Sequence, residues 1–295
     1  MQLLVYLLTY PILWVISKLP FILLYKVSDF LYIIFFHVVG YRKKLVLKNL
    51  TLCFPEKSHQ ELLTIRKKFY RHMCDLFLEM IKSLSMSHEE MERHAVFHNV
   101  EVLDKYAEQN KSVVLLCGHY GNYEWVLSLA NHIKHEGFGI YSPLSNKYFD
   151  RLIKRIRKKN GGELISRYQT ARKVLKNHRE NRLSIYGFVN DQSPQLVHSD
   201  YWREFFGVKV PVFTAAETLA KKFDMAVVFF CVEKVKRGYY ETTIIDIASN
   251  SAKYPDYQIT DIYWEYLERE IRNKPEYYLW THNRFKHKDK APKKR

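Results

Sequence analysis

The sequence has few of the residues that mark fibrous, disulfide-rich or metal-binding proteins. Its 10 glycines follow no Gly-X-Y period, which excludes a collagen-like chain. Its four cysteines are too far apart for a zinc site or a small disulfide framework, so we expect reduced thiols and no metal. The chain has no Asp-x-Asp motif and no Gly-rich phosphate loop after a strand, which argues against a nucleotide-sugar glycosyltransferase. We therefore expect no cofactor.

Acidic residues are also scarce relative to basic ones. The 295 residues include 31 Asp and Glu against 47 Lys and Arg, giving a net charge of +16, together with 22 Tyr, 18 Phe and 5 Trp. A basic and aromatic composition is typical of proteins that contact either nucleic acid or an anionic lipid surface. The basic residues are scattered and form no nucleic-acid-binding motif, so we expect no nucleic-acid partner.

The first 17 residues carry no charge and are nearly all apolar, and a second apolar run covers Phe30 to Val39. A secretory signal would need a basic start and a small-residue cleavage site, and neither is present. About 20 apolar residues are needed to span a bilayer, and Pro11 and Lys18 interrupt the first run. We expect residues 1–40 to form a helical membrane anchor in the interface or through it; the alternative is a buried helix pair of a soluble domain.

Residues 41–286 are expected to form one α/β domain, with a mixed central sheet flanked by helices, followed by a disordered basic tail at 287–295. Stretches of apolar β-rich residues alternate with amphipathic ones along this part of the chain. The expected helices are 58–85, 122–135, 146–159, 214–223 and 255–272, and the expected strands are 112–117, 138–142, 183–189, 225–232 and an antiparallel edge strand at 239–246.

The segment after the strand at 112–117 is the first candidate for a reactive site, because functional groups in such sheets lie where strands end. His119 follows this strand between Gly118 and Gly121, and Asn122 is suited to cap the next helix. Glu124 stands five residues after His119. A carboxylate on one ring nitrogen would fix the tautomer and leave the other nitrogen as a general base toward a hydroxyl.

The spacing of His119 and Glu124 carries no information by itself. A chain with 13 His and 31 acids is expected to contain such a pair by chance. Its position after an apolar strand, with glycines between the two residues, favours a functional role. The residues alone leave catalysis and a structural His–Glu hydrogen bond equally open.

With these segments the sequence resembles the lipid A biosynthesis acyltransferases, which add secondary acyl chains to the outer-membrane glycolipid of Gram-negative bacteria. The resemblance covers about residues 1 to 286 and rests on the order and spacing of several modest motifs. These are the uncharged N-terminus, Arg42-Lys43, Asn49-Leu50, Phe54-Pro55-Glu56, the His-x4-Asp/Glu box at 119–124, the Arg-rich helix before Gly161-Gly162, the segment 190–194, Phe205-Phe206-Gly207, the helix near Thr214 and the segment 275–286.

The resemblance implies a glycerolipid-acyltransferase-like fold and a reaction that uses these residues. His119 would deprotonate a hydroxyl of the acceptor, with Glu124 holding the ring, and the alkoxide would attack an acyl thioester. Arg157 occupies the family's position for an arginine that stabilises the oxyanion, and the nearby Arg155 is the alternative.

The substrate-binding candidates are Asp191, Asn190, Arg155 and Phe206. Asp191 sits where the family has its Asp-Gln pair and equally suits a turn cap, and Asn190 also has a structural interpretation. Phe206 is a candidate wall of the acyl channel, although packing suits it better.

By resemblance, the acyl donor is an acyl carrier protein or acyl-CoA, the acceptor is a lipid A precursor, and the location is the cytoplasmic side of the cell inner membrane. Relatives of this fold acylate other amphiphiles, including aminolipids and glycophospholipids, so the acceptor stays open. A non-enzymatic membrane or nucleic-acid-binding protein is the alternative from another class.

Overall fold

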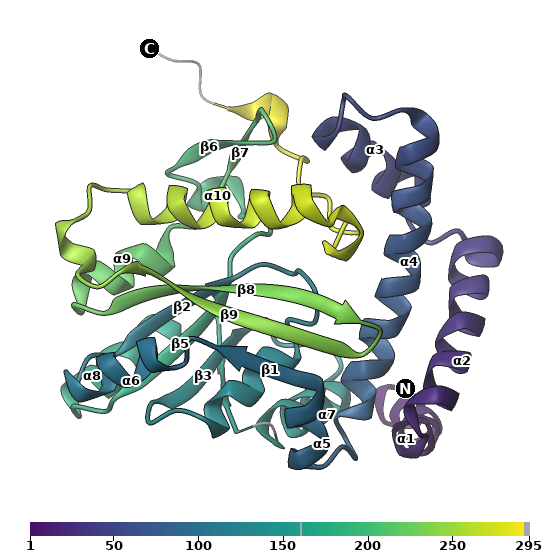
Figure 1. Cartoon of the computed structure of the whole chain (residues 1–295), viewed down its shortest axis with the longest axis horizontal. Coiled ribbons are helices and arrows are strands. Elements are labelled where there is room, and N and C mark those ends of the chain that lie inside the picture. The colour runs from purple at the N-terminus through teal and green to yellow at the C-terminus, as the bar shows by residue number, and fades with distance from the viewer. Residues whose placement is uncertain (160, 292–295) are drawn as a thin grey trace.

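A computed structural model describes residues 1–159 and 161–291 of the chain (Figure 1). The helices are α1 (Gln2–Lys18), α2 (Phe21–Tyr32), α3 (Lys43–Cys53), α4 (His59–Lys82), α5 (His88–His94), α6 (Glu101–Glu108), α7 (Lys147–Lys159), α8 (Thr170–Arg179), α9 (Ala215–Lys222) and α10 (Gln258–Asn273). The strands are β1 (Ala95–His98), β2 (Val113–Cys117), β3 (Glu136–Tyr141), β4 (Glu163–Ser166), β5 (Ser184–Val189), β6 (Trp202–Phe205), β7 (Val208–Pro211), β8 (Ala226–Lys236) and β9 (Tyr239–Ala248).

Seven strands form one sheet in the order β1-β9-β8-β2-β5-β3-β4, and β6 and β7 form a separate hairpin. Within the large sheet only β8 and β9 pair antiparallel, and the other neighbours are parallel. Figure 1 shows α10 along one side of this sheet and α6, α7 and α8 on the other. Because both sides are covered, β2 is buried over its full length, which explains its continuous apolar run. The expected α/β class with a mixed, helix-flanked sheet is confirmed.

Two details of the expected fold are wrong. β9 pairs antiparallel with β8 as expected, but it is not an edge strand, because β1 pairs with its other side. The sheet instead ends at β1 and β4, two four-residue strands too short for their sequence pattern to stand out. The expected helix over 122–135 is a 3₁₀ turn at Trp125–Asn131, in which Trp125 and Ser128 lie on the same buried side.

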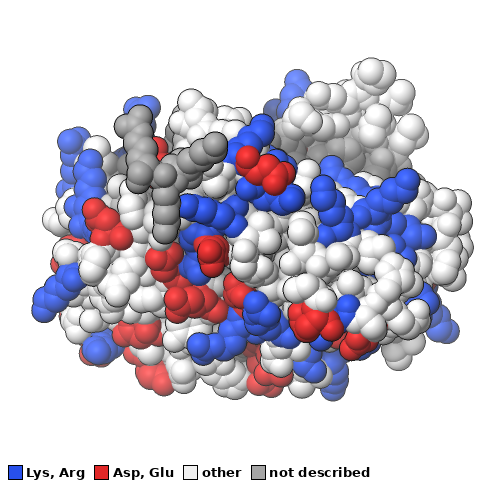
Figure 2. Space-filling model, turned by 90° about the horizontal axis from the view of Figure 1, so that it is seen from above, with Lys and Arg blue, Asp and Glu red and all other residues white. Residues whose placement is uncertain are grey.

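The N-terminus forms two apolar helices. α1 is followed by α2, which continues through a π-helical stretch, Ile33–Val39, into one helix long and apolar enough to cross a membrane. This helix, Phe21–Val39, has a mean hydropathy of 1.8, and only 22% of that window is buried. Figure 2 shows an almost uncharged lobe at the end of the molecule where these helices lie. Apolar side chains that α1 and α2 expose include Leu4, Leu8, Ile12, Trp14, Ile22 and Phe30.

The other side of α2 packs against the rest of the protein, chiefly α4. Leu24 is fully buried in a small cluster with Leu78 and Ile81 of α4. Farther along, Tyr32 and Phe36 belong to the main core. The expected boundary at residue 40 therefore separates segments that share a core. At the other end of the chain, Lys288–Lys290 form a single 3₁₀ turn, and residues 292–295 of the expected disordered tail lie outside the described residues.

If α2 is an integral part of the core, Leu24→Ala should lower the free energy of unfolding by about 2–5 kcal/mol, the usual range for a buried leucine. Leu23→Ala is the matched control, because the neighbouring side chain is 44% exposed and should change stability by less than about 0.5 kcal/mol. Chemical denaturation of the detergent-solubilised protein measures both. Equal, small effects would show that α2 is only an anchor.

Candidate active site

Two neighbouring parallel strands bring His119 and Asp191 together. β2 pairs with β5 in a register that sets Cys117 opposite Val189, the last residue of each strand. His119 and Asp191 each come two residues after this pair. Parallel strands lie about 4.8 Å apart, so residues at equal offsets beyond a paired position become neighbours at the carboxyl edge of the sheet.

The His119 imidazole contacts the Asp191 carboxylate directly. The distance from Nδ1 to Oδ1 is 2.6 Å, and the backbone amide of His119 donates to the same oxygen at 3.2 Å. The side chain of Asp191 is only 2% exposed. Burial acts to raise the pKa of Asp191, but attraction to His119 and the hydrogen bond from its ring outweigh burial and hold the pKa below its ordinary value. A buried carboxylate on Nδ1 makes this nitrogen the proton carrier and leaves Nε2 as the base.

The remaining nitrogen of His119 faces polar and aromatic neighbours. Nε2 lies 3.3 Å from the side-chain nitrogen of Gln192, and the ring meets Tyr123 edge-on, with 4.9 Å between centroids. The His119 side chain keeps 16% of its surface exposed. The ring is therefore partly accessible, and the Gln192 side chain lies next to Nε2.

A second ion pair joins the turn after β2 to α7. Arg157 donates from Nε and Nη2 to the two carboxylate oxygens of Glu124, at 2.8 and 2.7 Å. Burial acts to lower the pKa of the Arg157 guanidinium, but the charge of Glu124 and its hydrogen bonds raise it above the ordinary value. Two donors of the guanidinium are used by Glu124, which fixes the plane in which the others point.

These contacts correct the expected pairing. The sequence predicts that Glu124 holds the His119 ring, whereas the carboxylate on the ring is Asp191 and Glu124 binds Arg157. The physical reason is that the turn after β2 runs into a 3₁₀ helix, so that Glu124 faces α7. Tyr123 lies between the two pairs; burial and the charge of Glu124 raise its pKa, while Arg157 opposes this.

The C-terminal segment, one of the motifs that carry the family resemblance, holds the Asp191 loop in place. The Ser193 amide donates to Nε2 of His282 at 3.0 Å, and the Ser193 hydroxyl donates to the Arg284 carbonyl at 2.7 Å. Burial lowers the pKa of His282 to about 4, so the ring is neutral and can accept this hydrogen bond. Burial also lowers the pKa of Arg284 to about 10, although its guanidinium donates to Ser193 and to the Pro211 carbonyl.

The family of the chain follows from a comparison with known sequences. A sequence profile described as bacterial lipid A biosynthesis acyltransferase matches residues 2–287, which includes both pairs and the C-terminal segment. The chain belongs to this family. It is accordingly an acyltransferase, as the sequence predicts.

Two curated relatives are similar to this acyltransferase. The lipid A biosynthesis lauroyltransferase of Escherichia coli (strain K12) is 22% identical over 277 residues, covering 93% of this chain and 89% of the relative. The lipid A biosynthesis acyltransferase 2 of Shigella flexneri is 22% identical over 147 residues, covering 50% of this chain and 47% of the relative.

The other residues expected in this acyltransferase's site are spread more widely. Arg155 is exposed on α7, two residues before Arg157, and Asn190 is half-buried directly before Asp191. Phe206 lies in the turn between β6 and β7, where it contacts Phe54 and Arg272, which is a packing environment. No sequence pattern points to Tyr123, and Gln192 stands out only as part of the motif at 190–194.

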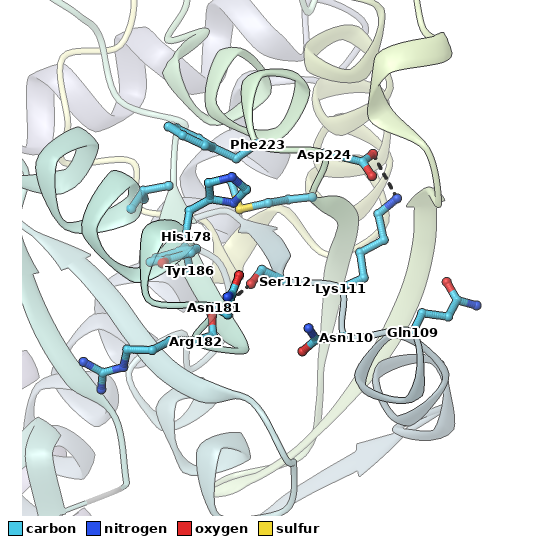
Figure 3. A pocket seen from close by; sticks show the side chains of 12 residues that line it. Gln109, Asn110, Lys111, Ser112, His178, Asn181, Arg182, Tyr186, Phe223 and Asp224 are labelled. Atoms are coloured by element: carbon cyan, nitrogen blue, oxygen red, sulfur yellow. Dashed lines mark hydrogen bonds and ion pairs between the residues drawn. The ribbon is translucent and has the colours of Figure 1, made fainter.

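A cavity of about 420 Å³ lies at the opposite edge of the sheet (Figure 3). Ser112 and Met225, which directly precede β2 and β8, help to line it, together with Lys111, His178 and Arg182. Because His119 follows the carboxyl end of β2 and this cavity surrounds the amino end, the cavity is separate from the two pairs.

Double-mutant cycles on the free energy of unfolding should report whether Glu124 contacts Arg157 or His119. Glu124→Gln and Arg157→Met should show a favourable coupling energy of about 0.5–3 kcal/mol, the range for residues in contact, when compared with the double variant. Glu124→Gln with His119→Ala should show less than about 0.5 kcal/mol, because these side chains belong to different pairs. Denaturant unfolding supplies all free energies. A large coupling of His119 with Glu124 would support the pairing expected from the sequence instead.

Proposed function

We propose that the protein transfers a fatty acyl chain from an acyl thioester, carried by an acyl carrier protein, to a hydroxyl of a lipid A precursor. The observation that carries this proposal is the contact between Nδ1 of His119 and the buried carboxylate of Asp191, in a chain of the lipid A acyltransferase family. The relative from Escherichia coli is a lipid A biosynthesis lauroyltransferase, which supports the substrate class.

In the proposed reaction His119 is the general base. Nε2 removes the proton from the acceptor hydroxyl while the new carbon–oxygen bond forms to the thioester carbonyl carbon. Asp191 holds the ring and stabilises the imidazolium that results, because it accepts from Nδ1. The tetrahedral intermediate then expels the thiolate by breaking the carbon–sulfur bond, and the imidazolium returns its proton to the sulfur.

Arg157 supplies positive charge for the oxyanion. The thioester oxygen becomes negative in the tetrahedral intermediate and is stabilised by donors that are already in position. Glu124 fixes Arg157 through two hydrogen bonds, so we assign Glu124 the role of orienting the guanidinium. Arg155 and Asn190 stay candidates for substrate binding near these groups, and Phe206 for the wall of the acyl channel.

We place the enzyme on the cytoplasmic side of the cell inner membrane. The exposed apolar residues of α1 and α2 support insertion of this end into the bilayer, because such surfaces are rarely left in water. Arg42 and Lys43 follow directly and would face anionic headgroups. A lipid A precursor, itself a membrane glycolipid, would reach His119 from this surface.

The acyl carrier protein is proposed as donor because it is acidic and the enzyme is not. α7 carries Arg157 toward Glu124 and exposes a row of cations on its other side. The exposed cations of this helix are Lys147, Arg151, Lys154, Arg155, Lys158 and Lys159. An acidic carrier docked on this face would have its thioester close to the two pairs.

Purified enzyme, a hydroxyacylated lipid A precursor and a labelled acyl carrier protein thioester test the function. Mass spectrometry should find a product heavier by one acyl chain. His119→Ala should lower kcat by at least about 10²–10⁴, the range for loss of a general base, without changing the melting temperature beyond a few degrees. A well-folded His119→Ala enzyme with near-normal turnover would contradict the mechanism. Transfer to an aminolipid or glycophospholipid, with none to the lipid A precursor, would overturn the proposed acceptor.

The choice of donor predicts a strong effect of salt. Charge attraction is screened over about 8 Å at physiological ionic strength, so KM for the acyl carrier protein should rise steeply between low and moderate salt while kcat holds. Lys158→Glu on α7 should raise this KM and reduce its salt dependence, and Lys105→Glu, exposed on α6, is the matched control. A salt-independent KM would favour a CoA donor.

A further inference from the structure

Four parts of the chain meet at a polar cluster, buried at its centre, beside the turn at 119–125. α2, α4, the β8–β9 hairpin, and the segment between His119 and Glu124 all contribute side chains. We call this cluster the polar junction; its members are Tyr25, Asp29, Asp75, Glu79, Asn122, Lys234, Arg237 and Tyr240. None of these residues belongs to the two catalytic pairs.

Glu79 is the centre of the polar junction. It is fully buried, and its carboxylate accepts from Tyr25 at 2.9 Å, from the Asn122 side chain at 2.9 Å and from Tyr240 at 2.8 Å. Burial raises the pKa of Glu79, while the positive charge of Lys234 and the two tyrosine hydroxyls act against this. The direct donors to the carboxylate are neutral, so each of them matters to its solvation.

The cations of the junction bind other carboxylates. Arg237 contacts both Asp75 of α4 and Asp29 of α2, at 2.6 and 2.7 Å, and Lys234 lies 3.4 Å from Asp75. These ion pairs join α2, α4 and the β8–β9 hairpin. Glu79, by contrast, accepts hydrogen bonds from the neutral members of the junction, Tyr25, Asn122 and Tyr240.

Asn122 connects Glu79 to the turn at 119–125. While its amide nitrogen donates to Glu79, its oxygen accepts from the Trp125 backbone amide at 3.2 Å. The indole of Trp125 in turn donates to Ser83, directly after α4, at 2.9 Å. Because Asn122 stands between His119 and Glu124, fixing its side chain fixes the backbone that presents members of both catalytic pairs.

Tyr25 links the polar junction to the apolar helix. The β8–β9 turn passes so close that a Cβ on Gly238 would lie 2.0 Å from the Tyr25 hydroxyl, and Gly238 itself adopts a φ of +79°. The guanidinium of Arg237 lies 4.4 Å from the centroid of the Tyr25 ring. Gly238 and Arg237 therefore confine the Tyr25 side chain, whose hydroxyl donates to Glu79. In this way α2 supplies one of the three donors to that carboxylate.

We propose that Glu79 is a positioning residue for acyl transfer and that Tyr25 makes the apolar helix α2 part of the active-site scaffold. This inference rests on the proposed function for its effect on turnover. Its structural content is a hydrogen-bonded chain from Tyr25 through Glu79 and Asn122 to the turn at 119–125. Membrane insertion of α2 and the geometry of the turn are then linked.

Tyr25→Phe, Glu79→Gln and the double variant test the chain of contacts. Tyr25→Phe removes one donor to the Glu79 carboxylate and keeps the ring. Glu79→Gln replaces one accepting carboxylate oxygen by an amide nitrogen, which cannot accept a hydrogen bond from the groups that donate to Glu79. The matched control is Tyr32→Phe on the same helix, a buried residue whose ring stacks on Phe36 and whose hydroxyl makes no hydrogen bond to the described residues.

The first measurement is hydrogen exchange of the turn in the full-length protein in detergent, which does not depend on any activity. The peptide containing the Trp125 amide should exchange on the order of tenfold faster in Tyr25→Phe and in Glu79→Gln, the factor that one hydrogen bond to a charged group is worth. Tyr32→Phe should leave exchange unchanged. Unchanged exchange of this peptide in Tyr25→Phe would overturn the proposal, whatever reaction the enzyme catalyses.

The second measurement is acyl transfer by the same variants. Tyr25→Phe should lower kcat about 3- to 10-fold with KM unchanged, and Glu79→Gln should lower it more. In the Glu79→Gln background, Tyr25→Phe should cost nothing further, because the two residues act in one chain.

A purely structural role would appear as a lower melting temperature with normal kcat for the folded fraction, which would contradict the proposal. Losses of kcat whose factors multiply in the double variant would show that Tyr25 and Glu79 act independently, and this would contradict it too. Absence of transfer by the wild-type enzyme would instead contradict the proposed function, and the exchange measurement would still decide the role of Glu79.

Discussion

The register between β2 and β5 is the constraint on which the site depends. These two parallel strands end together at Cys117 and Val189, and equal offsets of two residues then bring His119 and Asp191 into contact. A shift by one residue would turn the side chains of β2 to the opposite face of the sheet and separate the pair. All five residues of β2 are buried, and the strand lies between β8 and β5 in the sheet.

The turn that follows β2 is held from several sides. The Gly121 amide donates to the Tyr277 carbonyl, the Leu279 amide donates to the His119 carbonyl, and His72 of α4 lies 3.3 Å from the Gly121 carbonyl. Gly121 has a φ of +56°, and a Cβ there would lie 2.7 Å from Val232, so a side chain would displace the turn. Buried polar groups that are fully paired give a rigid local structure, which a general base and an oxyanion donor both require.

The α/β class, the order of most elements and the carboxyl-edge location of the site could be predicted, because they follow from apolar periodicity and strand–helix alternation. The sequence points to His119, Glu124, Arg157 and Asp191 as candidates, but not to the contacts between them. Nearness in sequence suggests Glu124 as the partner of His119, whereas contact with Asp191 depends on β5 lying next to β2, which no local pattern reveals. The roles of Glu79 and Tyr25 depend likewise on packing between distant helices.

The most direct test of the account is an NMR spectrum of ¹⁵N-histidine-labelled protein, in which the His119 signals are assigned by their loss in His119→Ala. A short contact with a buried carboxylate predicts a strongly downfield Nδ1 proton on His119. This proton signal should disappear in Asp191→Asn and persist in Glu124→Gln. Persistence in Asp191→Asn, with loss in Glu124→Gln, would contradict the pairing across β2 and β5 and assign the orienting role to Glu124.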